Sequence, residues 1–132
     1  MTVFVDTSAI FAMLDRGDAN HAQALRSWTR LCEGSARLVT NNYILVETTA
    51  VLQRRLGMAA VRAFHQDIVP LLEIHWVSET QHSPAMEAML SAARRKLSLV
   101  DCISFQTIRG HGIQTVFCFD SHFAEQGFDL TP

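Results

Sequence analysis

The stretch Val3-Phe4-Val5-Asp6-Thr7-Ser8 decides the fold class, because a short apolar run ends abruptly at an acid. An unbroken apolar run that is rich in β-branched and aromatic residues is typical of a strand buried on both faces. The acid at its end is a natural N-cap for the helix expected over residues 7–14. The stretch therefore predicts a buried strand that carries an acid at its carboxyl end and leads into a helix.

Outward from this stretch, strands and helices continue to alternate along the chain. Apolar runs predict further strands at residues 37–40, 72–77 and 115–119, and a short edge strand at 127–130. Helical spacing predicts helices at 19–32, 43–56, 58–69, 78–96 and 99–109, although Ser83-Pro84 is an alternative start for the fourth of these. Because parallel neighbours need a crossover helix, the pattern predicts an α/β fold with a mostly parallel sheet of four or five strands flanked by helices.

Length and composition limit the classes of protein. The 132 residues, without a repeat or a linker-like segment, predict one domain over 1–132. No apolar stretch is long enough to span a bilayer, and no basic leader precedes the first apolar run, so we expect a cytoplasmic protein with no membrane partner. The three cysteines, Cys32, Cys102 and Cys118, lack paired spacing and are interpreted as reduced core residues.

Three acids occupy positions where two explanations compete. Asp6 and Asp120 each follow an apolar run, and the carboxyl ends of parallel strands are where an open α/β sheet binds its ligand. Asp101 belongs to Ser98-Leu99-Val100-Asp101, which has the spacing of a capping box. Helix capping alone would explain each of these acids, so none of them identifies a site on its own.

Glu47 has no such simple explanation. Its neighbours three and four residues away on the expected helix are apolar: Tyr43, Ile44, Ala50 and Val51. A carboxylate in that setting needs a cation, a metal or hydrogen bonds, and the nearest arginines of the helix lie two turns away. Four acids that meet in space would suit Mg²⁺, a hard ion that prefers oxygen ligands, whereas cysteine or histidine would favour zinc.

The ordered stretches Val3–Ser8, Asn41–Glu47, Leu97–Asp101 and Phe119–Phe123 resemble the signature of PIN-domain ribonucleases over nearly the whole chain. The small size with no extra domain is similar to the VapC toxins of toxin–antitoxin pairs. The resemblance implies a PIN-like three-layer fold and an endoribonuclease that uses Mg²⁺ or Mn²⁺ to hydrolyse RNA. It also implies a homodimer and an antitoxin protein that neutralises the enzyme.

The resemblance also implies roles for particular residues. Asp6 and Asp101 would hold the main ion, Glu47 would orient the attacking water, and Asp120 would help to hold a second ion. Ser8 would support a water beside the first aspartate. Cys118 departs from the family, in which threonine often stands two residues before the last aspartate.

The basic residues give weaker signals. The run Arg94-Arg95-Lys96 precedes Asp101 and could contact RNA phosphates, or it could be a solvated helix end. The pair Arg54-Arg55 has the same two interpretations. The net charge of −2 becomes +2 when the four acids are set aside (−2 + 4), which is compatible with a nucleic-acid partner. His122 can approach the site because it lies two residues beyond Asp120, but no histidine is assigned a catalytic role.

Two other functions remain open at this stage. A phosphatase of the haloacid dehalogenase type also begins with a strand ending in aspartate, but it normally has a second aspartate where this chain has Ser8. A non-catalytic PIN-like binding protein would keep the acids only as caps. For contacts with protein partners, the helices bearing Trp28 and Phe64 are candidates, with core packing as the alternative.

Overall fold

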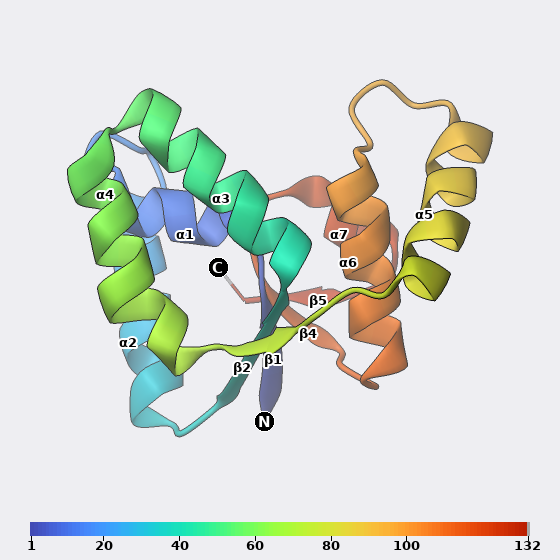
Figure 1. Cartoon of the computed structure of the whole chain (residues 1–132). Helices are drawn as coiled ribbons and strands as arrows, with labels where there is room; N and C mark the ends of the chain where they lie inside the picture. Colours follow the sequence, from blue (N-terminus) through green and yellow to red (C-terminus); the bar gives the residue numbers. More distant parts are fainter. Residues whose placement is uncertain (132) are drawn as a thin grey trace.

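A computed structural model describes residues 1–131 of the chain (Figure 1). Its centre is a five-stranded sheet in the order β3-β2-β1-β4-β5. All neighbouring strands are parallel, and Val3 of β1 lies opposite Leu38 of β2 and Thr115 of β4. The strands are β1 (Thr2–Val5), β2 (Arg37–Asn41), β3 (Glu73–His75), β4 (Thr115–Phe117) and β5 (Asp129–Leu130). The predicted α/β fold with a parallel sheet is confirmed.

Helices cover both faces of the sheet. The helices α1 to α4 lie on one side in Figure 1, and α5 to α7 lie on the other, which gives three layers. They are α1 (Thr7–Leu14), α2 (His21–Glu33), α3 (Asn42–Arg55), α4 (Met58–Ala63), α5 (Glu79–Ala92), α6 (Leu99–Gly110) and α7 (Ser121–Glu125). Among the described residues, no helix has the length and apolar character needed to cross a membrane.

The central strand lies at the heart of the hydrophobic core. Val3, Phe4 and Val5 are fully buried, as are Val116 and Phe117 on the neighbouring strand β4. Burial on both faces explains why these strands appear in the sequence as continuous apolar runs rather than alternating ones. The position of Asp6 is therefore fixed by a rigid strand.

Several predicted boundaries were wrong. The helix expected over 58–69 continues as a π-helical turn η1 (Phe64–Ile68) and a 3-10 turn η2 (Val69–Leu71). Pro70 does not stop it, because the proline lies in the first positions of η2, where its missing N–H is not needed. The strand expected over 72–77 is only Glu73–His75.

The fourth long helix begins at a different signal from Ser83-Pro84. Ser78 and Gln81 form a capping box at the start of α5, and Pro84 lies inside the helix. The helix also ends before the predicted residue 96, because Ala93 adopts a left-handed conformation with φ of 49°. Residues 93–98 consequently connect α5 to α6, with residues 93–96 exposed and Leu97 buried.

One of the three cysteines was assigned to the core wrongly. Cys102 and Cys118 are buried as predicted, but Cys32 is exposed. The helix α2 buries the face that carries Ala24, Ser27 and Leu31, so the residue after Leu31 points outward.

Candidate active site

The acids gather at the carboxyl end of the sheet because helices begin there. Asp6 is the N-cap of α1 and Asp120 is the N-cap of α7, while Asp101 is the third residue of α6 in a capping box with Ser98. The capping explanations are thus all correct, and the same acids nevertheless line one cleft together with Glu47. Capping and gathering have one cause, since the helix N-termini that need caps point towards this end of the sheet.

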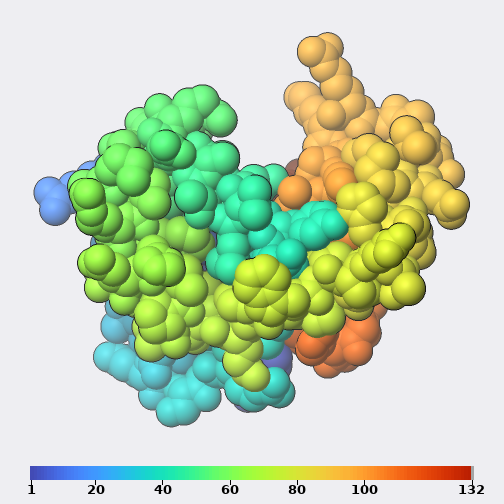
Figure 2. Space-filling view, viewed as in Figure 1, coloured from blue at the N-terminus to red at the C-terminus, as the bar shows by residue number. Residues whose placement is uncertain are grey.

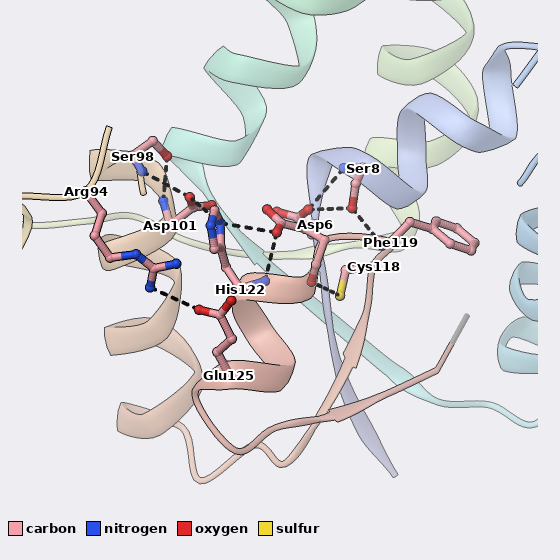
Figure 3. A network of polar contacts seen from close by, with 10 residues as sticks. Asp6, Ser8, Arg94, Ser98, Asp101, Cys118, Phe119, His122 and Glu125 are labelled. Carbon is pink, nitrogen blue, oxygen red and sulfur yellow. Dashed lines mark hydrogen bonds and ion pairs between the residues drawn. The ribbon is translucent and has the colours of Figure 1, made fainter. Parts of the chain in front are cut away.

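The carboxyl group of Asp6 is held by Ser8. Its Oδ2 accepts hydrogen bonds from the Ser8 backbone N–H at 3.1 Å and from Ser8 Oγ at 2.7 Å. Ser8 Oγ in turn accepts a hydrogen bond from the backbone N–H of Phe119 at 2.9 Å. Figure 3 shows this chain of contacts, which connects the end of β1 to the segment after β4. Ser8 therefore fixes the orientation of Asp6, and Asp6 Oδ1 accepts no hydrogen bond from the described residues.

Asp101 and Asp120 likewise use one oxygen each for capping. Asp101 Oδ2 accepts from the Ser98 N–H at 3.0 Å, and Asp120 Oδ1 accepts from the His122 N–H at 2.9 Å. Within residues 1–131, Asp101 Oδ1 and Asp120 Oδ2 have no hydrogen-bond partner. Each acid therefore keeps one oxygen available to a ligand in the cleft.

His122 lies between these two acids. Its Nδ1 is 3.2 Å from Asp120 Oδ1 and 3.5 Å from Asp101 Oδ2. The nitrogen is buried, and no described residue gives it a hydrogen bond of good geometry. Ligand atoms of the three residues all lie within 4.8 Å of one another, a spacing that one metal ion could bridge. From the sequence, His122 could be expected to approach the site but not to take a particular role there, because the position of its ring depends on how α7 packs.

Glu47 reaches the cleft from α3. The helix is anchored by Asn41, whose Oδ1 accepts from the Ile44 N–H at 2.9 Å and whose Nδ2 donates to Thr107 on α6 at 3.2 Å. Glu47 is half-buried rather than enclosed among apolar side chains, since the cleft opens beside it. Glu47 thus lines the cleft, where the Thr7 side chain acts to lower its pKa and a bound cation would be a further partner.

Burial and mutual repulsion raise the pKa values of three acids. Burial raises the pKa of Asp6 to about 7 against the opposing hydrogen bonds from Ser8, and the charges of Glu47 and Asp101 add to the rise. Burial is also the first cause that raises the pKa of Glu47 and of Asp101, with the Asp120 charge contributing to both. These carboxylates repel one another and would be stabilised by a cation placed between them.

Cys118 occupies the position where the family resemblance leads one to expect threonine. Its Sγ donates to the backbone carbonyl of Asp120 at 3.7 Å, so the thiol makes a weak version of a hydroxyl contact. Burial raises its pKa to about 12, and the charges of Asp6 and Asp120 act in the same direction. The thiol therefore stays protonated and supports the turn that carries Asp120.

The cleft has a volume of about 380 Å³ and a lining of mixed chemistry. Its lining includes the four acids and Ser8, the apolar side chains of Phe11 and Val51, and the charged side chains of Asp18 and Arg55. Figure 2 shows the surface hollowed between α3 and the connection from α5 to α6. The lining is therefore mostly negative, with one basic side chain and apolar surface beside it.

The basic run predicted to contact RNA lies outside this cleft. Arg94 donates to Glu125 at 3.0 Å (Figure 3). The Arg94 side chain is half exposed. Arg95 and Lys96 are exposed in the connection between α5 and α6. Arg55, for which sequence analysis left two interpretations open, lines the cleft itself.

Comparison with known proteins shows relatives along the whole chain. The PIN domain matches residues 3–129. The 23S rRNA-specific endonuclease VapC20 of Mycobacterium tuberculosis is 35% identical over 127 residues, which cover 96% of this chain and 95% of the relative. Its crystal structure, described as a sarcin–ricin loop cleaving toxin, matches with a TM-score of 0.83 at 34% identity over 98% of this chain and 99% of that one.

Two more distant structures share the fold. FitAcB from Neisseria gonorrhoeae has a TM-score of 0.69 at 15% identity and covers 100% of this chain and 97% of that chain. VapBC2 from Rickettsia felis, bound to a DNA fragment from its promoter, has a TM-score of 0.71 at 10% identity, over 98% of this chain and 97% of that one.

These matches exclude one of the two alternatives left open by the sequence. The haloacid dehalogenase interpretation is wrong, because the order of elements and the match over residues 3–129 are those of another family. Ser8 stands where that interpretation needs a second acid, and its hydroxyl is committed to Asp6 and Phe119. With a full-length relative that is an endonuclease and a nuclease fold throughout, the chain belongs to the PIN-domain family.

Proposed function

We propose that this protein is a divalent-metal-dependent endoribonuclease, the toxin of a toxin–antitoxin pair, whose active site is formed by Asp6, Glu47, Asp101 and Asp120. One observation carries the proposal. Three acids that cap helices each leave one oxygen free, and with Glu47 they line a single cleft. Capping alone would not require the free oxygens to share a cavity.

The possible ligands are carboxylate oxygens and one imidazole nitrogen, a set that fits a hard divalent ion. Carboxylate oxygens suit Mg²⁺ and Mn²⁺, and the Nδ1 of His122 beside Asp101 and Asp120 suits Mn²⁺ better than Mg²⁺. When bound, such an ion polarises a phosphoryl oxygen and lowers the pKa of water. Asp6, Asp101 and Asp120 would hold the ion, and His122 would be a further ligand.

The two remaining groups of the site are Glu47, which acts on the attacking water, and Ser8, which orients the carboxylate of Asp6. Glu47 orients the attacking water and accepts its proton, and the raised pKa of Glu47 brings this base closer to neutral pH. Ser8 holds the Asp6 carboxylate through Oδ2 and leaves Oδ1 without a hydrogen bond from the described residues. The reaction is a direct hydrolysis in which the water oxygen forms a bond to phosphorus as the bond to the leaving oxygen breaks.

As substrate we propose a structured loop of 23S ribosomal RNA. The support is the relative that cuts 23S rRNA, which matches this chain at 35% identity across 96% of its length. Small nucleases of this size select RNA by its shape and by unpaired bases rather than by reading a duplex. A cleft of about 380 Å³ is compatible with an unpaired strand.

For the antitoxin we propose a docking surface beside the active site. An apolar pocket of about 330 Å³ is lined by Asn42, Tyr43, Val46, Glu47 and Val100, and it shares Glu47 with the acid-lined cleft. Val46 is 70% exposed, which is unusual for an aliphatic side chain. A segment bound there would cover the entrance to the acids.

A homodimer remains part of the proposal and would be tested by light scattering.

The two aromatic side chains considered for partner contacts are packed rather than exposed. Phe64 is buried in the core and Trp28 is packed against it, in agreement with the core-packing alternative. The large exposed apolar side chains are Met1, Leu25, Val46, Met58, Leu71, Trp76 and Leu90. After the first residue, Val46, Trp76 and Leu90 are the most exposed of these. Partner surfaces are therefore expected on α3, after β3 and on α5.

The test is cleavage of purified ribosomes and of 23S rRNA with Mg²⁺ or Mn²⁺, with cut sites mapped by primer extension. We expect one dominant cut in a loop, its loss with a chelator, and its loss in Asp101→Asn. Glu73→Gln removes an acid outside the cleft and serves as the control. Equal cutting by wild type and Asp101→Asn would overturn the assigned site, and absence of cutting by wild type would favour a non-catalytic binding protein.

A further inference from the structure

Arg55 holds a place in the cleft that no other cation shares among the described residues. The cleft is lined by five acids, the four of the site together with Asp18, and by this one basic side chain. An RNA strand entering the cleft would meet net negative charge everywhere except at the bound ion and at Arg55. The end of the cleft away from the ion therefore needs a group that attracts phosphate.

The helix α3 places Arg55 in line with the proposed base. Glu47, Val51 and Arg55 follow one another at intervals of four residues, and all three line the cleft. Eight residues of helix correspond to a rise of about 12 Å. A phosphate at Arg55 is consequently not the one that is cut but a neighbour of it along the strand.

The guanidinium of Arg55 is held in place by an aromatic ring. Its central carbon lies 4.5 Å from the ring centroid of Phe11, and the residues described in the structure form no ion pair with it. A guanidinium held face-down on a ring keeps its N–H edge available for a bidentate contact with phosphate. Arg94, by contrast, already pairs with Glu125 outside the cleft.

We propose that Arg55, supported by Phe11, is a positioning residue that binds the phosphate of a nucleotide flanking the scissile bond. This inference rests on the proposed ribonuclease function and deepens it. Arg55 sets the affinity and the register of the RNA, while the acids perform the reaction. Its effect should therefore appear in KM and in salt dependence rather than in kcat.

The chain provides a matched control in the neighbouring Arg54. Arg54→Gln removes the same charge from the same end of α3, but Arg54 does not line the cleft. We expect Arg55→Gln to raise KM for an RNA loop by about tenfold, as for the loss of a charge-assisted contact, with kcat within about twofold of wild type. Arg54→Gln should stay within about twofold in KM. The slope of log affinity against log salt should fall by about 1 in Arg55→Gln only.

Two further variants distinguish a positioning role of Arg55 from a general effect of its charge, and thermal unfolding distinguishes both from a loss of folding. Arg55→Lys keeps the charge but loses the planar fork, so it should restore KM only partly. Phe11→Leu removes the ring and keeps an apolar side chain, and its effect on KM should disappear in the Arg55→Gln background. Thermal unfolding of each variant reports any loss of folding separately.

The outcomes distinguish this inference from the proposed function. If wild type cuts RNA but Arg54→Gln and Arg55→Gln raise KM equally, or if Arg55→Gln lowers kcat with KM unchanged, the role of Arg55 is wrong and the active site stands. If wild type neither cuts nor binds RNA, the proposed function fails and the role of Arg55 fails with it.

Discussion

The floor of the cleft and its basic rims are built in opposite ways. Asp6 and Asp101 on the floor are buried or half-buried, and hydrogen bonds at helix N-termini hold each of them. The basic rims are exposed: Arg55 lines the cleft at the end of α3, whereas Arg94 lies outside the cleft, after α5. Of these two arginines, only Arg94 has an ion-pair partner among the described residues. The floor is therefore rigid and electrostatically strained, whereas the rims are solvated. Changes in the floor should alter the chemical step, and changes in the rims should alter binding.

The largest expected effect comes from the floor. Asp101→Asn keeps an acceptor for the capping box but removes the negative charge, so we expect a loss of about 10³-fold or more in kcat. Single-turnover cleavage of the RNA loop measures it, with circular dichroism to confirm an unchanged fold. A loss smaller than tenfold would show that the floor and the rims do not differ as proposed.

The second effect concerns stability: replacing Asp6 in the floor should make the metal-free protein more stable, not less. The pKa of Asp6 rises from 3.8 to about 7 on folding. The contribution of Asp6 to the free energy of unfolding is therefore full below about pH 4 and is lost as the pH rises through about 7. Without metal, wild type should lose stability over this range, and Asp6→Asn should be more stable by about 1–3 kcal/mol at pH 8.

Urea unfolding with a chelator at pH 5 and pH 8 measures this difference. The advantage of Asp6→Asn should shrink at pH 5 and should reverse when Mn²⁺ is added, because only wild type gains from binding the ion. Equal stability of the two proteins at pH 8 would mean that the floor is not strained by the charge of Asp6.

Much of the floor could be predicted from sequence, because its signals are local. Asp6 follows a buried strand, and Ser98 with Asp101 has capping-box spacing, so each position could be inferred from its neighbours. The approach of His122 to Asp101 and the place of Arg55 over Phe11 depend on how helices pack, which no local pattern encodes. The strands β3 and β4 were predicted too long for the same reason, since pairing partners decide where a strand ends.

A third effect lies at the edge of the floor. His122→Gln removes the imidazole beside Asp101 and Asp120 but keeps the backbone N–H that Asp120 accepts. We expect Mn²⁺ affinity to fall by about tenfold and Mg²⁺ affinity to change less, because a nitrogen ligand favours the transition metal. Calorimetric titration with each ion tests this. Equal losses for both ions would contradict a role of the imidazole as ligand.

The smallest effect is expected from the rim outside the cleft. Changing Arg94, Arg95 and Lys96 to glutamine should raise KM by about threefold at low salt and by less at physiological salt, because exposed charges are screened. Steady-state kinetics at two ionic strengths measure this. An effect on KM larger than that of Arg55→Gln would place the main RNA contact on this rim instead.

The central claim is that four acids from separate segments meet at one site that binds divalent metal. Its most direct test is a Mn²⁺ titration followed by electron paramagnetic resonance, comparing wild type with Asp6→Asn, Asp101→Asn and the control Glu73→Gln. The account predicts one or two bound ions, an affinity that falls by at least about tenfold in both cleft variants, and no change in the control. Unaltered Mn²⁺ binding in Asp6→Asn and Asp101→Asn would contradict it.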